Sequence, residues 1–129
     1  MLLADDHPQL RHNLRLVLEH EQDMKVVAEA GDLEGAIRGM RSHRPDVLVL
    51  DLRMPNGSSS ERISRLREQS PRTEIVVITM QENRMFADQA LKDGAIGFVL
   101  KDRADQELAD AVRDAARGVE YRSQHLRAT

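Results

Sequence analysis

Short apolar runs alternate with longer amphipathic stretches along the whole chain. Each run is too short for a buried helix, and all but the first contain β-branched residues, so we interpret them as strands. The predicted strands are Leu2-Leu3-Ala4, Lys25 to Ala30, Val47 to Leu50, Glu74 to Ile78 and Gly97 to Leu100. The third run is apolar at every position, which is typical of a strand that is buried on both faces of a sheet.

In the stretches between these strands, apolar positions recur with the period of an α-helix. The stripes run from Leu10 to Leu18, Leu33 to Met40, Ile63 to Leu66, Ala87 to Leu91 and Leu108 to Ala116. Gly94 and Gly118 follow the last two stripes, as expected of glycines that end helices. Because strands and helices alternate with short loops, we predict an α/β protein with a doubly wound, five-stranded parallel sheet.

The length of 129 residues fits one globular domain. We expect residues 1–118 to form this domain, because the last helical stripe and its glycine end there. Residues 119–129 have no apolar stripe, and we expect them to be a C-terminal tail or the start of a linker.

The composition excludes several classes of protein. A net charge of −3 argues against a domain that itself coats nucleic acid or an anionic membrane, since both need a basic face. Aromatic residues make up only 2%, too few for a base-stacking platform. The absence of cysteine excludes disulfides and thiolate chemistry and fits a reducing compartment. Because no apolar run approaches the ~20 residues of a membrane span, we expect a cytoplasmic domain.

Polar residues that can carry chemistry follow four of the predicted strands. Asp5 and Asp6 follow the first, Asp51 follows the third, and Thr79 and Lys101 follow the fourth and fifth. In an open parallel sheet these strand ends share one edge, where ligands bind. Crowded carboxylates need a cation, and oxygen ligands suit Mg²⁺ or Mn²⁺. With Lys101 and Thr79 as donors to a phosphoryl group, the set predicts phosphoryl chemistry with Asp51 as nucleophile.

Each of these residues also has a purely structural explanation. Asp5 and Asp6 can cap a helix that begins at Pro8. Asp51 can cap a turn, and Lys101 can be an ordinary solvated charge. Because a single sheet edge is expected to collect all of them, we favour the functional interpretation.

The other polar residues are expected to be solvated. The histidines lie in polar surroundings or at spacings that do not share a helix face, so we expect surface histidines that add no metal site. Arg62, Arg65 and Arg67 are interleaved with acidic residues, which indicates a solvated helix face.

Four segments at the predicted strand ends form a recognisable set. They are LLADDHP at 2–8, VLVLDLRMP at 47–55, Thr79-Met80, and GFVLKD at 97–102. Together they resemble the receiver domain of a two-component response regulator, a CheY-like domain with the flavodoxin-like (βα)5 fold. The forms ADDH, DLRMP and GFVLKD are most similar to the subfamily whose receiver precedes a LuxR/NarL-type helix-turn-helix. The resemblance covers the chain to about Gly118.

This resemblance implies a phospho-acceptor site. Asp51 is expected to accept a phosphoryl group from the phosphohistidine of a sensor histidine kinase. The resemblance assigns Mg²⁺ or Mn²⁺ to Asp6, Asp51 and the backbone carbonyl of Arg53, with Asp5 acting through a water molecule.

The resemblance also implies a conformational switch. Thr79 and Lys101 are expected to contact the phosphoryl group. Phe98 is expected to turn inward when Thr79 moves, which remodels the face of the fourth helix, fifth strand and fifth helix. Plain core packing is the alternative explanation for Phe98.

Two features depart from the subfamily pattern. Met80 is bulkier than the small residue that many receivers carry after their threonine, so we expect it to modulate access to Asp51 and slow both phosphorylation and hydrolysis. Residues 56–59 read Asn-Gly-Ser-Ser where the subfamily usually has Gly-Met-Asp-Gly, which alters the expected loop and its pairing with a kinase.

The leading hypothesis is therefore a receiver that is no enzyme beyond its own phosphorylation and dephosphorylation. Its expected output is transcription through a helix-turn-helix domain that is not present in this chain. The alternative is an atypical receiver that acts as a phosphorylation-independent protein-interaction module. A phosphorylation-dependent homodimer is a further expected partner state. A haloacid-dehalogenase-type phosphatase is disfavoured, because Arg53 stands where its second aspartate is needed. A nucleotide or flavin binder is disfavoured because the chain has no glycine-rich phosphate loop.

Overall fold

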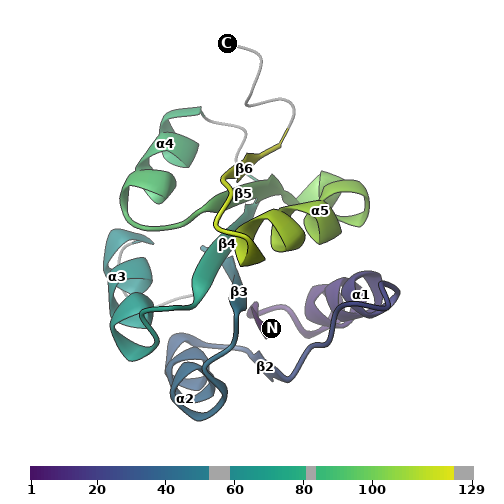
Figure 1. Ribbon diagram of the computed structural model, residues 1–129, viewed down its shortest axis with the longest axis horizontal. Coiled ribbons are helices and arrows are strands. Elements are labelled where there is room, and N and C mark those ends of the chain that lie inside the picture. Colours follow the sequence, from purple (N-terminus) through teal and green to yellow (C-terminus); the bar gives the residue numbers. More distant parts are fainter. Residues whose placement is uncertain (53–58, 81–83, 124–129) are drawn as a thin grey trace.

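A parallel sheet of six strands lies at the centre of the computed structural model, which describes residues 1–52, 59–80 and 84–123 (Figure 1). The strand order is β2-β1-β3-β4-β5-β6. The strands are β1 (Leu2–Ala4), β2 (Ala28–Ala30), β3 (Val47–Asp51), β4 (Glu74–Thr79), β5 (Gly97–Leu100) and β6 (Tyr121–Arg122). The helices are α1 (Pro8–Glu19), α2 (Leu33–His43), α3 (Ser59–Gln69), α4 (Arg84–Lys92) and α5 (Ala104–Ala116), with a 3-10 turn, η1 (Lys101–Arg103), before α5. The predicted α/β class and doubly wound parallel sheet are confirmed.

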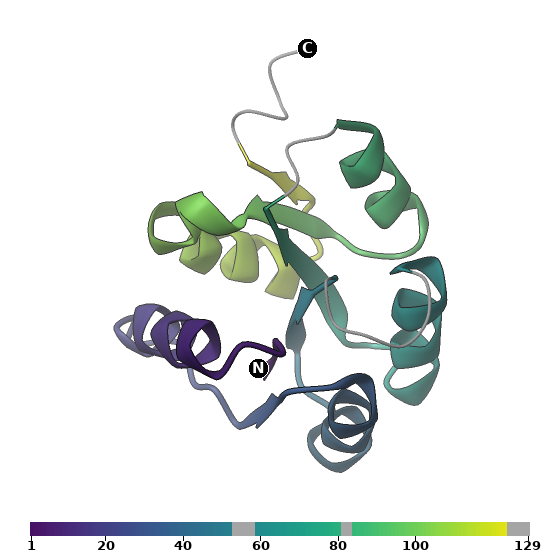
Figure 2. The same ribbon diagram turned by 180° about the vertical axis from the view of Figure 1, so that it is seen from behind.

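Helices cover both faces of the sheet. Figures 1 and 2 show α1 and α5 on one face and α2, α3 and α4 on the other. Successive residues of β3 supply the two cores in alternation: Leu48 and Leu50 pack with α2, α3 and α4, whereas Val47 and Val49 pack with α1 and α5. The continuous apolar run of β3 thus reflects burial on both faces, as predicted.

The second strand is shorter than predicted. The sequence analysis expects it from Lys25 to Ala30, whereas β2 contains only residues 28–30. The reason is the length of its neighbour, because β1 offers three residues and pairs Leu2 with Ala28 at its start. Val26 still reaches the core beside α1 and α5 without belonging to the strand.

The far edge of the sheet carries a strand that the sequence analysis does not predict. Tyr121 and Arg122 pair in parallel with Gly97 and Phe98 of β5. Two residues are too few to show the alternation of apolar and polar positions that indicates a strand, so no sequence pattern indicates β6 within the expected tail. The boundary of the domain at Gly118 stays a prediction.

Glycines end α4 and α5 as predicted. Gly94 has a φ of +124° and Gly118 a φ of +75°, values that side chains other than glycine rarely adopt. A Cβ atom on Gly94 would also lie 2.8 Å from Cδ of Arg67. Within the described ranges, none of the helices combines the length and the apolar character that a membrane span requires.

Candidate functional site

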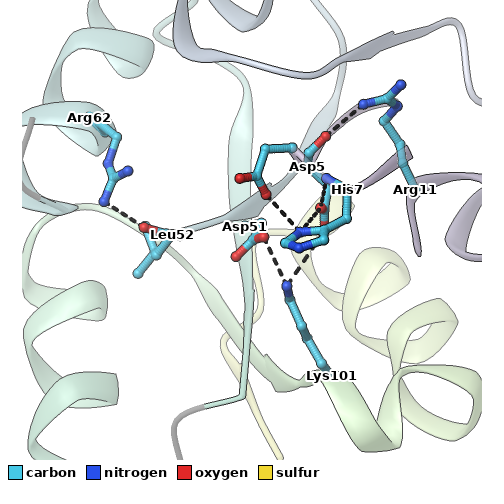
Figure 3. A network of polar contacts seen from close by, with 8 residues as sticks. Asp5, His7, Arg11, Asp51, Leu52, Arg62 and Lys101 are labelled. Atoms are coloured by element: carbon cyan, nitrogen blue, oxygen red, sulfur yellow. Dashed lines mark hydrogen bonds and ion pairs between the residues drawn. The ribbon is translucent and has the colours of Figure 1, made fainter. Parts of the chain in front are cut away.

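The carboxyl ends of β1, β3, β4 and β5 place the candidate residues along one edge of the sheet. Asp51 is the last residue of β3, Thr79 is the last residue of β4, and Lys101 directly follows β5. Thr79 pairs with Leu100, so the ends of β4 and β5 lie side by side. Figure 3 shows Asp5, Asp51 and Lys101 turned toward one another. The expected convergence at one edge is therefore present for these residues.

Lys101 joins two buried carboxylates. Its Nζ lies 2.8 Å from Oδ2 of Asp51 and 3.7 Å from Oδ2 of Asp5. Both carboxylate side chains are 0% exposed, and the lysine side chain is 6% exposed. Two buried anions thus share one permanent cation, an arrangement that leaves excess negative charge in a poorly solvated place.

Asp5 is the least satisfied group of the site. Its Oδ1 accepts a hydrogen bond of 2.8 Å from the backbone N–H of His7, but its Oδ2 has no hydrogen-bond partner among the described residues. Burial raises the pKa of the Asp5 carboxyl; the amide of His7 opposes this effect, and the negative charge of Asp51 adds to it. Helix α1 has His7 at its N-cap position and Pro8 in its first turn, without a side-chain cap. Asp5 therefore belongs to the acidic cluster at the carboxyl edge of the sheet, and it does not occupy the N-cap position of α1 that the alternative explanation gave it.

Four residues could together hold a metal ion. Asp5, Asp6, His7 and Asp51 each offer one ligand atom, and these atoms lie within 4.8 Å of one another. The unpartnered, buried oxygen of Asp5 and the oxygen-rich donor set both fit a hard divalent cation. Arg53, whose carbonyl the sequence analysis adds to this set, lies outside the described residues.

Sequence reasoning missed that His7 lies beside the acids of the site, and the expectation that the histidines add no metal site stays a prediction. The His7 side chain is 57% exposed, yet Nδ1 lies 2.9 Å from Oδ1 of Asp6 and 3.7 Å from Oδ1 of Asp5. The bond from its own amide to Asp5 tightens the turn after β1 and brings the imidazole back over the acids. The sequence signal was its position directly after the acid pair, which helix-face spacing does not test.

Arg62 is a second residue that sequence reasoning misplaced. It was expected on a solvated helix face, but it is only 6% exposed. From α3 its guanidinium donates a hydrogen bond of 2.5 Å to the carbonyl of Leu52, the residue after Asp51 (Figure 3). Burial lowers the pKa of Arg62, and the negative charge of Asp51 opposes that shift. Arg62 therefore fixes the backbone that leaves β3.

Arg11 performs a similar role on the other side of the site. It donates a hydrogen bond of 2.7 Å from a guanidinium nitrogen to the carbonyl of Asp5, while its Nε lies 3.0 Å from a carboxylate oxygen of Glu29. The turn between β1 and α1 is thus held from α1 and from β2. Sequence periodicity gives no signal for this bond, because it joins residues on three elements.

The expected switch residues occupy distinct positions. Thr79 is 1% exposed, and Phe98 is fully buried with its ring edge-on to Phe86 of α4, at a centroid distance of 6.2 Å. Met80 is 55% exposed and lines a shallow groove of about 440 Å³ together with Lys101 and residues of α1. The predicted inward turn of Phe98 stays a prediction. Residues 56–58, to which the loop prediction applies, lie outside the described residues.

The fold and the site define a doubly wound α/β domain with a buried acidic cluster and a lysine at the carboxyl edge of its sheet. Residues 1–113 match the family of response regulator receiver domains. The oxygen regulatory protein NreC of Staphylococcus epidermidis is 39% identical over 122 residues, which are 94% of this chain and 56% of that protein. The chain therefore spans about half the length of this relative.

Solved structures agree with this match. A LuxR-family two-component response regulator from Aurantimonas has a TM-score of 0.91 and 32% identity, covering 98% of this chain and 90% of that chain. The isolated receiver of RcsB from Salmonella enterica serovar Typhimurium, solved with the phosphomimetic BeF₃⁻, has a TM-score of 0.88 and 28% identity, covering 98% and 94%. The chain belongs to the response regulator receiver domains, in the LuxR/NarL-type group of two-component systems.

Proposed function

We propose that this chain accepts a phosphoryl group on Asp51 from the phosphohistidine of a sensor histidine kinase, in a reaction that depends on Mg²⁺ or Mn²⁺. The observation that carries the proposal is the 2.8 Å contact between Lys101 and Asp51 inside a buried cluster, where Oδ2 of Asp5 has no hydrogen-bond partner in the described residues. A carboxylate beside a fixed ammonium, next to a site for a divalent cation, suits the transfer of a dianionic group.

The transfer itself is a simple displacement. A carboxylate oxygen of Asp51 forms a bond to phosphorus, the phosphorus–nitrogen bond to the kinase histidine breaks, and the electron pair returns to the imidazole. Lys101 neutralises charge on the phosphoryl oxygens, and the hydroxyl of Thr79 donates a hydrogen bond to one of them. Asp6, Asp51 and the carbonyl of Arg53, with Asp5 through water, would hold the cation, which would supply further positive charge.

The consequences for partners follow from the same site. When Lys101 and Thr79 move to contact the phosphoryl group, the conformation of the face formed by α4, β5 and α5 changes. Phe98 packs against Phe86 in this face. We propose that this change controls an output, either a homodimer or transcription through a helix-turn-helix domain in a longer protein, without direct contact between this domain and nucleic acid. Met80, on the groove beside Lys101, modulates access to Asp51.

Intact-mass spectrometry after treatment with acetyl phosphate and Mg²⁺ tests the proposal. We expect the wild-type chain to gain one phosphoryl group, and the Asp51→Asn variant to gain none. Asp46→Asn, at the opposite end of the same strand region, is the matched control and should be labelled like the wild type. A wild-type chain that stays unlabelled, and binds its partners regardless, would support a phosphorylation-independent interaction module in its place.

A further inference from the structure

A second buried carboxylate, Glu107 of α5, lies at the centre of a polar network that the phosphoryl site does not use. Glu107 is 5% exposed. It accepts hydrogen bonds from Nε of Arg103 at 2.5 Å and from the hydroxyl of Tyr121 at 2.9 Å, and the nearby Ser123 side chain also lowers its pKa. Burial by itself raises the pKa of Glu107, but these three groups outweigh burial, so the pKa lies below its ordinary value. The group is a satisfied, ionised hub.

Ser123 connects this hub to β5. Its hydroxyl accepts a hydrogen bond of 2.9 Å from the backbone N–H of Leu100, and its own N–H donates one of 2.9 Å to the carbonyl of Phe98. The segment that contains Ser123 is also bonded to Glu107 through the hydroxyl of Tyr121, so the amide of Leu100, the segment 121–123 and the Glu107 carboxylate belong to one network. Ser123 is fully buried, so water does not compete for these bonds.

The network holds the turn that carries Lys101 at both of its ends. Leu100 is the residue before Lys101, and Arg103 is the last residue of η1, the turn that Lys101 begins. Glu107 reaches the first end through the segment 121–123, by the hydroxyl of Tyr121, and the second end through Arg103. The position of the Lys101 backbone therefore depends on a carboxylate one helical turn further along the chain.

Residues 121–123 also contact α4. A guanidinium nitrogen of Arg122 lies 2.8 Å from a carboxylate oxygen of Asp88, although both side chains are partly exposed and the pair is worth little on its own. The segment 121–123 is thus bonded to β5, α5 and α4, the elements that form the face beside Phe98. It lies at the start of the predicted linker.

We propose that Glu107 and Ser123 are positioning residues for Lys101, and that through them the segment 121–123 is energetically linked to the phosphoryl site. The link to phosphoryl binding rests on the proposed function. A Lys101 turn that is fixed in advance binds a phosphoryl group without paying for its own ordering. Because linkage is reciprocal, occupation of the site tightens the hold on residues 121–123 by the same factor by which the network strengthens binding at the site.

Calorimetric titration with BeF₃⁻ in saturating Mg²⁺ tests this link, with BeF₃⁻ as the phosphoryl mimic. Glu107→Gln and the milder Ser123→Ala should each bind BeF₃⁻ roughly three- to tenfold more weakly than the wild type, the effect of one or two lost hydrogen bonds. Asp110→Asn, an exposed acid on the same helix, is the matched control and should bind like the wild type. Affinity for Mg²⁺ alone should be unchanged in all three, since the network touches none of the candidate metal ligands.

Amide hydrogen exchange by NMR supplies a readout that does not need BeF₃⁻. Exchange at Leu100 and Ser123 should be faster in Glu107→Gln than in Asp110→Asn, and in the wild type BeF₃⁻ should slow it. Variants with faster exchange at these amides but wild-type affinity for BeF₃⁻ would overturn the proposal, as would unchanged exchange in Glu107→Gln. If the wild type binds no BeF₃⁻, the proposed function fails, and the exchange comparison alone still decides whether Glu107 positions the Lys101 turn.

Discussion

Replacing Asp5 by asparagine should stabilise the fold. The substitution keeps an oxygen to accept the 2.8 Å bond from the amide of His7, but removes a buried negative charge whose second oxygen has no partner among the described residues. It also relieves repulsion from Asp51, which the single ammonium of Lys101 only partly offsets. An orphaned buried charge costs about 1–3 kcal/mol, and the shared lysine reduces the gain, so we expect about 1–2 kcal/mol.

The pH dependence of this difference identifies its cause. The pKa of Asp5 is raised in the folded state, so the folded state binds the proton more tightly than the unfolded state does. Protonation of Asp5 therefore adds to the stability of the fold below the pKa of the unfolded state, roughly 3.9, and this stability is lost as the pH rises through the higher pKa of the folded state. Asp5→Asn does not titrate there, so its advantage over the wild type should be smallest in acid and reach its full size at neutral pH.

Urea and thermal denaturation without divalent cations, repeated across pH, measure the effect. At pH 7 the variant should melt about 3–8 °C higher than the wild type. Saturating Mg²⁺ should stabilise the wild type more than the variant, because binding to the native state adds stability. Asp6→Asn is the control, since Asp6 is 31% exposed and its removal relieves less burial. An Asp5→Asn variant that is less stable than the wild type at pH 7 would refute the reasoning.

Three further substitutions test other parts of the site. Lys101→Met should lower the free energy of unfolding by about 2–4 kcal/mol at pH 7, because two buried carboxylates lose their cation. Adding Asp5→Asn should recover part of this loss, and a double variant that is no more stable than Lys101→Met would contradict the reasoning. Arg62→Met should lower the free energy of unfolding, measured with urea, by about 1–3 kcal/mol, because the carbonyl of Leu52 loses its donor. Arg65→Met on the same helix should lower it by less than ~0.5 kcal/mol, and equal losses in the two variants would show that the buried bond is unimportant. Gly94→Ala should lower thermal stability by about 1–3 kcal/mol, given its φ of +124° and the 2.8 Å approach to Arg67, and a variant that melts with the wild type would show that this helix end can rearrange.

The sheet could be predicted from the sequence because burial on two faces leaves a local pattern. Every residue of β3 from Val47 to Leu50 is apolar, and both cores draw on them. β6 left no such pattern, since its two residues are held by bonds to β5 and by the distant Glu107. Short edge strands depend on partners that lie elsewhere in the chain, and only the folded structure brings those partners together.

The candidate site was predictable for the same kind of reason, and incomplete for another. Topology alone sends the ends of parallel strands to one edge, so Asp51 and Lys101 could be paired from their positions after two apolar runs. Arg62 and His7 could not be placed in this way. A charge interleaved with acids on a helix looks solvated, and the 6% exposure of Arg62 depends on the carbonyl of Leu52 lying opposite it. His7 reaches the acids through a single turn set by its own backbone amide.

Two buried acids on either side of Lys101 differ in how well their hydrogen bonds are satisfied, and this difference bears on the link between the site and β6. Oδ2 of Asp5 has no hydrogen-bond partner in the described residues and only a 3.7 Å contact with Lys101, and burial raises the pKa of this carboxyl, so a bound cation would offset an unfavourable charge that is already present there. Glu107 has two hydrogen-bond donors and a lowered pKa, so every movement of its partners has a cost. If both acids had all their hydrogen bonds, a ligand would add little stability at the site. If both acids lacked them, the turn that carries Lys101 would not be held in place. Lys101 lies between the two: it contacts Asp51 at 2.8 Å and directly follows Leu100, whose amide is bonded to Ser123, and the proposed link between Asp51 and residues 121–123 runs through these contacts.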